Sequence, residues 1–175
     1  MIKLHLGSGG NYIEGWINID TGSKIKVDEC FDLRNPLPYQ NNSINFIYNE
    51  HFIEHLTYDQ GFLLLKECYR VLMPTGVLRI STPNLEWIVE KYVENNITEW
   101  ANIRFNPISK CFMLNESLRR WGHQFVYDPP ELKNILRLSG FHTLKQCEWR
   151  KSNFSELSML ESRLYHKEII IEATK

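Results

Sequence analysis

Short apolar runs alternate with polar, turn-forming stretches along most of the chain. Seven of these runs have the length and β-branched or aromatic content that predict strands. They are Lys3–Leu6, Trp16–Ile19 ending at Asp20, Lys26–Phe31, Ile44–Tyr48, Val77–Ser81, Phe141–Trp149 and Lys167–Ala173. Only Gly7 to Gly15 connects the first two strands, and a parallel crossover normally takes about a dozen residues. Either the first crossover helix is shortened or missing, or these two strands are not neighbours.

Three segments have helical spacing and start signals. Thr57 and Gln60 form a capping box ahead of an apolar face made of Gly61, Leu64, Leu65, Cys68 and Leu72. Pro83-Asn84 opens a second helix, in which Leu85, Ile88, Val89, Tyr92 and Val93 recur at helical spacing. Asp128-Pro129-Pro130-Glu131 starts a third helix, with Leu132, Ile135 and Leu136 facing the core and Gly140 at its end. Alternating strands and helices predict an α/β domain with a mostly parallel sheet.

The stretch from Thr98 to Tyr127 is irregular and rich in aromatic residues. We expect one or two short helices there, with Leu114, Leu118 and Trp121 facing inward. A long segment between regular units is often a lid or a pocket wall. The sequence therefore predicts one domain over residues 1–175, with 98–127 as a lid or substrate segment.

Composition narrows the possible classes of protein. A chain of 175 residues fits a single domain, and its net charge of -1 argues against non-specific nucleic-acid binding. The four cysteines form no CxxC pair, which favours reduced thiols over a disulfide frame or a zinc site. Neither a membrane-length apolar run nor a signal peptide is recognised, so we expect a cytoplasmic protein without membrane attachment.

Polar and glycine residues gather where the predicted strands end. The first strand runs into Gly7-Ser8-Gly9-Gly10, the second ends at Asp20, the third at Asp32-Leu33 and the fourth at Asn49-Glu50-His51. In a parallel sheet these carboxyl ends share one edge, where ligands bind at the topological switch point. Glycines let a ligand approach backbone N–H groups, which suits a carboxylate or a phosphate.

Several runs carry a family resemblance that covers nearly the whole chain: HLGSGG, GWINID, FDLRNPLPYQNNSINFIYNEHFIEHL, LLLKECYRVLMPTGVLRISTPNL, WGHQFVYDPPELKNILRLSGF and IIIEATK. The chain resembles the class I S-adenosylmethionine-dependent methyltransferases, and more closely their small type 11 methyltransferase-domain subgroup. The resemblance implies a three-layer, Rossmann-like sheet that is mostly parallel with an antiparallel last strand. It also implies S-adenosylmethionine as the cofactor.

The resemblance assigns cofactor contacts to residues at the strand ends: Gly7, Ser8, Gly9, Asp20, Asp32, Leu33, Asn49 and Glu50. The glycine loop would lie against the methionine part, and Asp20 would accept hydrogen bonds from both ribose hydroxyls. Asp32 and the Leu33 backbone would contact the adenine. Asn49 and Glu50 would flank the sulfonium. Two positions depart from the family pattern. His5 replaces the usual acidic residue before the first glycine, and Pro74-Thr75-Gly76 replaces a PGG turn.

Two histidines are the candidate catalytic residues. His51 follows the fourth strand, and His123 lies in Trp121-Gly122-His123, where it could also simply hold the loop. Histidine titrates near neutral pH and suits a general base that removes a proton from a hydroxyl or amine acceptor. Glu161 resembles a position where the subgroup also has Glu, although a solvated helix carboxylate is the simpler interpretation.

His51 also begins an H-x-x-E-H pattern with Glu54 and His55, which is the inverted zinc-peptidase signature. That signature requires a long helix, and here the pattern follows a strand. His55 then fits a structural histidine, and we expect no metal.

The sequence thus predicts methyl transfer from S-adenosylmethionine to a small-molecule or sugar acceptor at a hydroxyl or amine. An S-adenosylmethionine- or nucleotide-binding module without transfer activity is the alternative. The oligomeric state is not encoded in any recognisable pattern.

Overall fold

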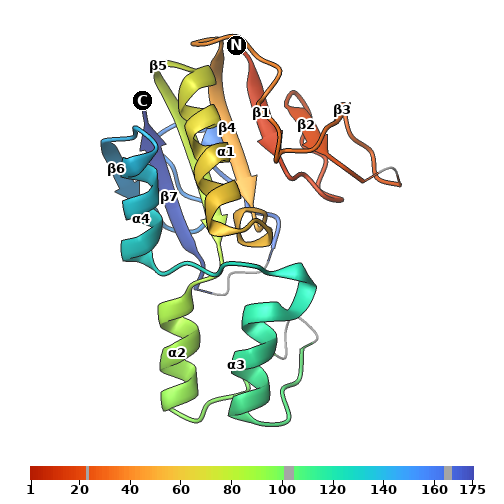
Figure 1. The fold of residues 1–175 in the computed structure, drawn as a ribbon, viewed down its shortest axis with the longest axis vertical. Coiled ribbons are helices and arrows are strands. Elements are labelled where there is room, and N and C mark those ends of the chain that lie inside the picture. The colour runs from red at the N-terminus through yellow and green to blue at the C-terminus, as the bar shows by residue number, and fades with distance from the viewer. Residues whose placement is uncertain (23, 101–104, 164–166) are drawn as a thin grey trace.

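The computed structural model describes residues 1–22, 24–100, 105–163 and 167–175 (Figure 1). Seven strands form one sheet in the order β3-β2-β1-β4-β5-β7-β6. The strands are β1 (Lys3–Leu6), β2 (Ile17–Asp20), β3 (Glu29–Cys30), β4 (Ile44–Glu50), β5 (Leu72–Thr82), β6 (Thr143–Gln146) and β7 (Ile169–Thr174). The α-helices are α1 (Tyr58–Val71), α2 (Leu85–Val93), α3 (Lys110–Arg119) and α4 (Pro129–Leu138). Short 3-10 turns are η1 (Ile53–His55), η3 (Arg120–Gly122) and η4 (Ser155–Leu157).

The strand directions confirm the predicted sheet. β1, β2, β3, β4 and β5 pair in parallel, and β7 lies antiparallel between β5 and β6. β1 sits beside both β2 and β4, so the chain reverses its direction of winding there. The carboxyl ends of β1, β2 and β4 consequently meet at one edge, as the sequence predicts.

The first crossover contains no helix, which confirms the expectation drawn from its length. The buried side chain of Asn18 on β2 holds the short connection instead. Its Oδ1 accepts a hydrogen bond from Ile13 N at 2.9 Å, and its Nδ2 donates to the carbonyls of Ile13 and Trp16. His5 Nδ1 also lies 3.1 Å from Asn18 Oδ1. One amide thus satisfies backbone groups that a helix would otherwise pair within itself.

Helices α1 and α4 cover one face of the sheet (Figure 1), and both begin as the sequence predicts. Thr57 and Gln60 form the capping box of α1, and Asp128 caps α4 through Glu131 N at 2.8 Å. The opposite face is covered by the irregular segment around η4, where Leu157 packs with Trp16, Tyr48 and Val77. The third layer is therefore mostly loop in this chain.

Helices α2 and α3 form a small unit beyond the end of the sheet (Figure 1). Its core is a separate apolar cluster that includes Trp87, Trp100 and Met113. Leu114 and Leu118 pack against this cluster as expected, but Trp121 was wrongly predicted to face inward, because 51% of it is exposed. Part of the predicted lid segment, residues 101–104, lies outside the described residues.

Three strands differ from the sequence prediction by three or more residues at one end. Lys26–Phe31 shrinks to Glu29–Cys30, because the Asp28 side chain accepts the hydrogen bond from Asn18 N in place of a strand carbonyl. β5 begins early, at Leu72, with a register shift opposite Ile44–Phe46 that accommodates the Pro74 turn. The strand predicted over Phe141–Trp149 is limited to β6, where pairing with β7 holds it.

A buried charge network lies under β5. The Arg79 side chain is fully buried and donates to Glu161 Oε1 and Glu172 Oε1, each at 2.7 Å. Glu161 is 1% exposed and lies outside any helix, so the solvated helix carboxylate considered from the sequence is wrong. The four cysteines are free thiols, in agreement with their scattered spacing.

Candidate functional site

A cavity of about 640 Å³ lies at the sheet edge beside the glycine loop. The residues predicted to bind the cofactor that line it are Gly7, Ser8, Gly9, Asp20 and Glu50. His5, the departure from the family pattern, lines it as well. The structure therefore brings together loop, second-strand and fourth-strand residues that lie far apart in the sequence.

Asp20 and the glycine loop are in direct contact. Asp20 Oδ2 accepts a hydrogen bond from Gly9 N at 2.9 Å, and Oδ1 accepts one from Gly22 N at 3.0 Å. Gly7 and Ser8 both direct their N–H groups to the carbonyl of Ile19, at 2.9 and 3.1 Å. These loop N–H groups are thus engaged within the protein. The expected cradle of N–H donors for a carboxylate is not formed at these positions.

The absence of a side chain at Gly7 and Gly9 lets other groups approach the backbone closely. Gly7 has a φ of +68°, and a Cβ there would lie 2.3 Å from the ring of Phe52. Gly9 has a φ of +52°, but no described heavy atom lies within 4 Å of a Cβ placed there. Gly7 is therefore required by packing, whereas the open side of Gly9 leaves room for a ligand.

Glu50 connects the end of β4 to the segment that precedes β7. Its carboxylate accepts hydrogen bonds from Ser162 N, Ser162 Oγ at 2.6 Å and Arg163 N at 3.2 Å. The residue is 7% exposed. Sequence reasoning missed Ser162 and Arg163, which line the cavity from a segment without periodic pattern.

Asn49, Asp32 and Leu33 are predicted cofactor residues that the structure does not bring to this cavity. Asn49 is buried and donates through Nδ2 to the carbonyl of Leu6 at 3.1 Å. Leu33 is 3% exposed and packs in the main core. The Asp32 carboxylate bonds Arg34 at 2.6 Å, and this guanidinium lowers the pKa of Asp32 to about 2.

A second cavity, of about 390 Å³, lies between the strand tips and the α2–α3 unit. Three tryptophans line it: Trp87, Trp100 and Trp121. Trp121 has a φ of +62°, an unusual conformation for a bulky residue, and it places its ring 5.6 Å from that of His123. His51, His55 and Arg163 line both cavities, so the two spaces meet at these residues.

His51 is held in a strained conformation at this junction. Its φ is +49°, and its N–H donates to the carbonyl of Ser81 at 2.8 Å. The ring nitrogens face two carboxylates, with Nδ1 3.3 Å from Glu54 and Nε2 3.7 Å from Glu168. Burial disfavours the charged ring, but Glu168 and Glu54 outweigh it and raise the pKa of His51 to about 9. His51 is therefore protonated at neutral pH, which disfavours the role of a general base.

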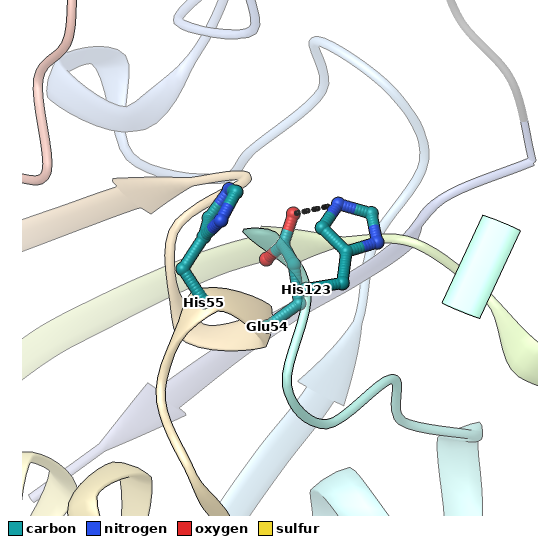
Figure 2. A group of neighbouring side chains, drawn as sticks. All are labelled: Glu54, His55 and His123. Atoms are coloured by element: carbon teal, nitrogen blue, oxygen red, sulfur yellow. Dashed lines mark ion pairs between the residues drawn. The ribbon is translucent and has the colours of Figure 1, made fainter. Parts of the chain in front are cut away.

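Glu54, His55 and His123 form a compact group beside the junction (Figure 2). Glu54 is completely buried, and its Oε2 accepts a hydrogen bond from Thr82 Oγ1 at 3.0 Å. His123 Nδ1 lies 3.0 Å from the carbonyl of Ser117, which leaves Nε2 facing Glu54 Oε1 at 4.0 Å. Burial lowers the pKa of His123. Burial alone would raise the pKa of Glu54, but His51 lowers it.

Similarity to known proteins agrees with this geometry. A model of the methyltransferase domain family, Methyltransf_11, matches residues 19–80. No curated protein matches the chain significantly. The fold is similar to a SAM-dependent methyltransferase from Archaeoglobus fulgidus, with a TM-score of 0.57, 19% identity and coverage of 91% of this chain and 76% of that one.

Two further structures share the fold. A SAM-dependent methyltransferase from Thermotoga maritima has a TM-score of 0.60 at 17% identity, covering 99% of this chain and 82% of that one. A Haloferax volcanii complex of the Trm112 methyltransferase activator with a methyltransferase gives a TM-score of 0.65 at 13% identity, covering 99% and 81%.

The sheet topology is shared with these SAM-dependent methyltransferases, and the family model matches residues 19–80, which is less than half of the chain. Over these residues the chain resembles the methyltransferase-domain family. In the part of the chain that the structure describes, no helix has the length and apolar character needed to cross a bilayer.

Proposed function

We propose that this protein transfers a methyl group from S-adenosylmethionine to a small-molecule acceptor, at a hydroxyl or an amine. The observation that carries the proposal is the junction of the two cavities at His51, His55 and Arg163. A cofactor in the glycine-loop cavity and an acceptor among the tryptophans would meet there. The protein would act chiefly by holding the two reactants in line, since the cofactor carries its own leaving group.

The cofactor cavity fits the ribose and methionine parts of S-adenosylmethionine. Asp20 offers carboxylate oxygens at its rim for the ribose hydroxyls, and Gly9 leaves open space beside the loop. A neutral His5 offers one acceptor nitrogen but no negative charge for the methionine amino group, and Glu50 is a carboxylate that lines the same cavity. Asp32 and the Leu33 backbone remain proposed contacts of the adenine.

The acceptor cavity favours a flat or ring-shaped molecule. Tryptophan faces bind sugar rings and aromatic rings through large apolar contact areas, and the polar tip of the cavity lies at Glu54 and His123. We propose that residues 105–127 act as the wall of this cavity, since Ser117, Trp121 and His123 come from them. His123 would contact the reacting oxygen or nitrogen of the acceptor.

Two measurements test the proposal. Calorimetric titration should show binding of S-adenosylmethionine and S-adenosylhomocysteine. Incubation with S-adenosylmethionine carrying a labelled methyl group and a panel of sugars, phenols and amines should then transfer label to at least one acceptor. Failure to bind either cofactor form would overturn the proposal. Binding without transfer across the panel would favour the alternative, a module that binds S-adenosylmethionine without turnover.

The zinc-peptidase alternative has little support from the geometry. Its signature residues lie on a strand end and on η1, which spans only Ile53–His55, and not on a long helix. The ring of His51 faces Glu54 and Glu168.

One of the similar structures, from Haloferax volcanii, is a methyltransferase in complex with an activator protein. A protein partner of this kind is therefore a further hypothesis for this chain.

A further inference from the structure

We propose that Glu54, His55 and His123 bind a first-row divalent metal ion, such as Zn²⁺ or Co²⁺, which positions the methyl acceptor. This proposal rests on the proposed function and deepens it by assigning a chemical role to the acceptor end of the site. The H-x-x-E-H pattern contains Glu54 and His55, but we expected no metal from the sequence, and His123 joins these two residues only through the fold.

The donor atoms are already gathered. One ligand atom from each of the three residues lies within 4.8 Å of the others. Figure 2 shows the Glu54 carboxylate between the rings of His55 and His123, whose centroids are 5.1 Å apart. Two ligands on one tetrahedral zinc lie about 3.3 Å apart, so small side-chain rotations would close the site. Two imidazoles and one carboxylate form a donor set typical of zinc, iron and cobalt.

The free atoms of the group point to a ligand. Glu54 is fully buried, and its Oε1 has no hydrogen-bond partner among the described residues. Its nearest cationic neighbour is the His51 ring, whose Nδ1 lies 3.3 Å from that oxygen. The ion pair with His51 leaves this oxygen without a hydrogen bond, and a bound cation would give it a direct ligand contact.

The second polar atom of His123 and of Glu54 is held by a hydrogen bond to a neighbouring group, as is usual for metal ligands. His123 uses Nδ1 on the Ser117 carbonyl at 3.0 Å, and Glu54 uses Oε2 on Thr82 Oγ1 at 3.0 Å. Such outer contacts fix the tautomer of the imidazole and the orientation of the carboxylate. Nε2 of His123 and Oε1 of Glu54 are therefore the atoms left to face a cation.

Backbone bonds clamp the two ligand segments together. Gln124 N and Phe125 N both donate to the carbonyl of Glu54, at 2.7 and 3.2 Å. The side chain of Gln124 donates to the carbonyl of His55 at 2.6 Å. The loop that carries His123 is thus attached directly to η1, so the three ligands are preorganised before any cation binds.

All three ligands line the acceptor cavity, so the open coordination positions would face the acceptor. One or two acceptor oxygens would complete the coordination, and the cation would lower the pKa of a bound hydroxyl. His123 would then act as a ligand, and no separate imidazole base would be needed. A compound with neighbouring oxygen atoms, such as a sugar diol or a catechol, is the class of acceptor that this arrangement fits.

Metal binding can be measured without knowledge of the acceptor. Purified protein stripped with a chelator is dialysed against Zn²⁺ or Co²⁺, and bound metal is counted by mass spectrometry. We expect one ion per chain, with visible Co²⁺ absorption that reports imidazole ligation. His55→Gln and His123→Gln should each weaken affinity at least tenfold, and Thr82→Val about 10–100-fold, the usual effect of losing an outer contact.

A matched control separates this site from others. His142→Gln removes an exposed histidine away from the group, so this variant should still bind one ion. Absence of stoichiometric metal in the wild type, or unchanged affinity in His123→Gln, would overturn the proposal. His55 is partly exposed, so His55→Gln keeps the test valid if His123→Gln does not fold. Titration of the same proteins with S-adenosylhomocysteine shows independently whether the cofactor cavity works.

Discussion

The main-chain N–H of Gly9 donates a hydrogen bond to Asp20 Oδ2 at 2.9 Å, which ties the loop after β1 to the end of β2. The same carboxylate accepts a bond from Gly22 N. Asp20 therefore shapes the cavity wall even without a ligand. Asp20 also lines the cavity in which we propose that it contacts the ribose of the cofactor.

We predict that Asp20→Ala weakens the binding of S-adenosylhomocysteine by about 1–3 kcal/mol, the cost of leaving buried polar groups without partners. Calorimetric titration measures the change. Asp59→Ala is the control, because Asp59 is an exposed carboxylate outside the cavity lining. Equal affinity losses in both variants would mean that the loss does not come from a contact between Asp20 and the ribose.

Gly9→Ala and Gly7→Ala should fail in different ways. A methyl group at Gly7 would overlap the ring of Phe52, so Gly7→Ala should lower the unfolding midpoint strongly. A methyl group at Gly9 meets open space in the protein, so Gly9→Ala should remain folded and lose cofactor affinity by tenfold or more. Thermal unfolding together with titration separates the two effects. Normal cofactor affinity in a folded Gly9→Ala protein would place the ligand elsewhere.

The fold was predictable because its signals are local. The capping box at Thr57, the start signal at Asp128 and the apolar faces of α1 and α4 each lie within a few consecutive residues. The short first crossover was also visible, from the number of residues between two strands. Its structural solution, the bonds made by Asn18, was not, since an asparagine in a strand has no distinctive pattern.

The site was only partly predictable, because its residues come together through distant contacts. The strand ends marked the glycine loop, Asp20 and Glu50, all of which line one cavity. The contact between His123 and Glu54 depends on a loop docking onto η1, which no spacing records. The charge state of His51 likewise depends on Glu168, which approaches from just before β7.

His5 gives a test of pH-dependent stability. It is 1% exposed, and burial lowers its pKa below the usual 6.5, although its bond to Asn18 opposes the shift. As the pH falls below about 6.5, the unfolded chain takes up a proton at this position before the folded chain does. Stability should therefore be complete above that pH and decrease as acid is added.

Urea unfolding at several pH values between 7.5 and 5 would measure this contribution, compared between wild type and His5→Gln. We expect the unfolding free energy of the variant to fall less steeply with decreasing pH. The difference in slope should correspond to at most one proton taken up on unfolding. His142→Gln, on an exposed histidine, should keep the wild-type slope. Parallel curves for wild type and His5→Gln would show that His5 takes up its proton at the same pH in the folded and unfolded protein.

Arg79 links the sheet to the segment that closes the cofactor cavity. Its guanidinium holds Glu161, the residue before Ser162 and Arg163, and these two bind Glu50. Arg79→Met would leave Glu161 and Glu172 buried without their cation, which should cost about 3–5 kcal/mol of unfolding free energy. Lys151→Ala, at the exposed pair with Glu148, should have no measurable effect.

Arg79→Met should also weaken cofactor binding if the charge network positions residues 162–163. Glu161 also accepts a bond from Arg150 N at 3.0 Å, so some anchoring remains when Arg79 is lost. We therefore expect folded Arg79→Met protein to bind S-adenosylhomocysteine more weakly than wild type, whereas Lys151→Ala binds normally. Adding Glu161→Gln and Glu172→Gln to Arg79→Met should recover stability, because neutral amides remove the unpaired buried charges. It should not recover cofactor affinity, because the contact between residues 79 and 161 is still missing. Recovery of both together would show that the network serves stability alone.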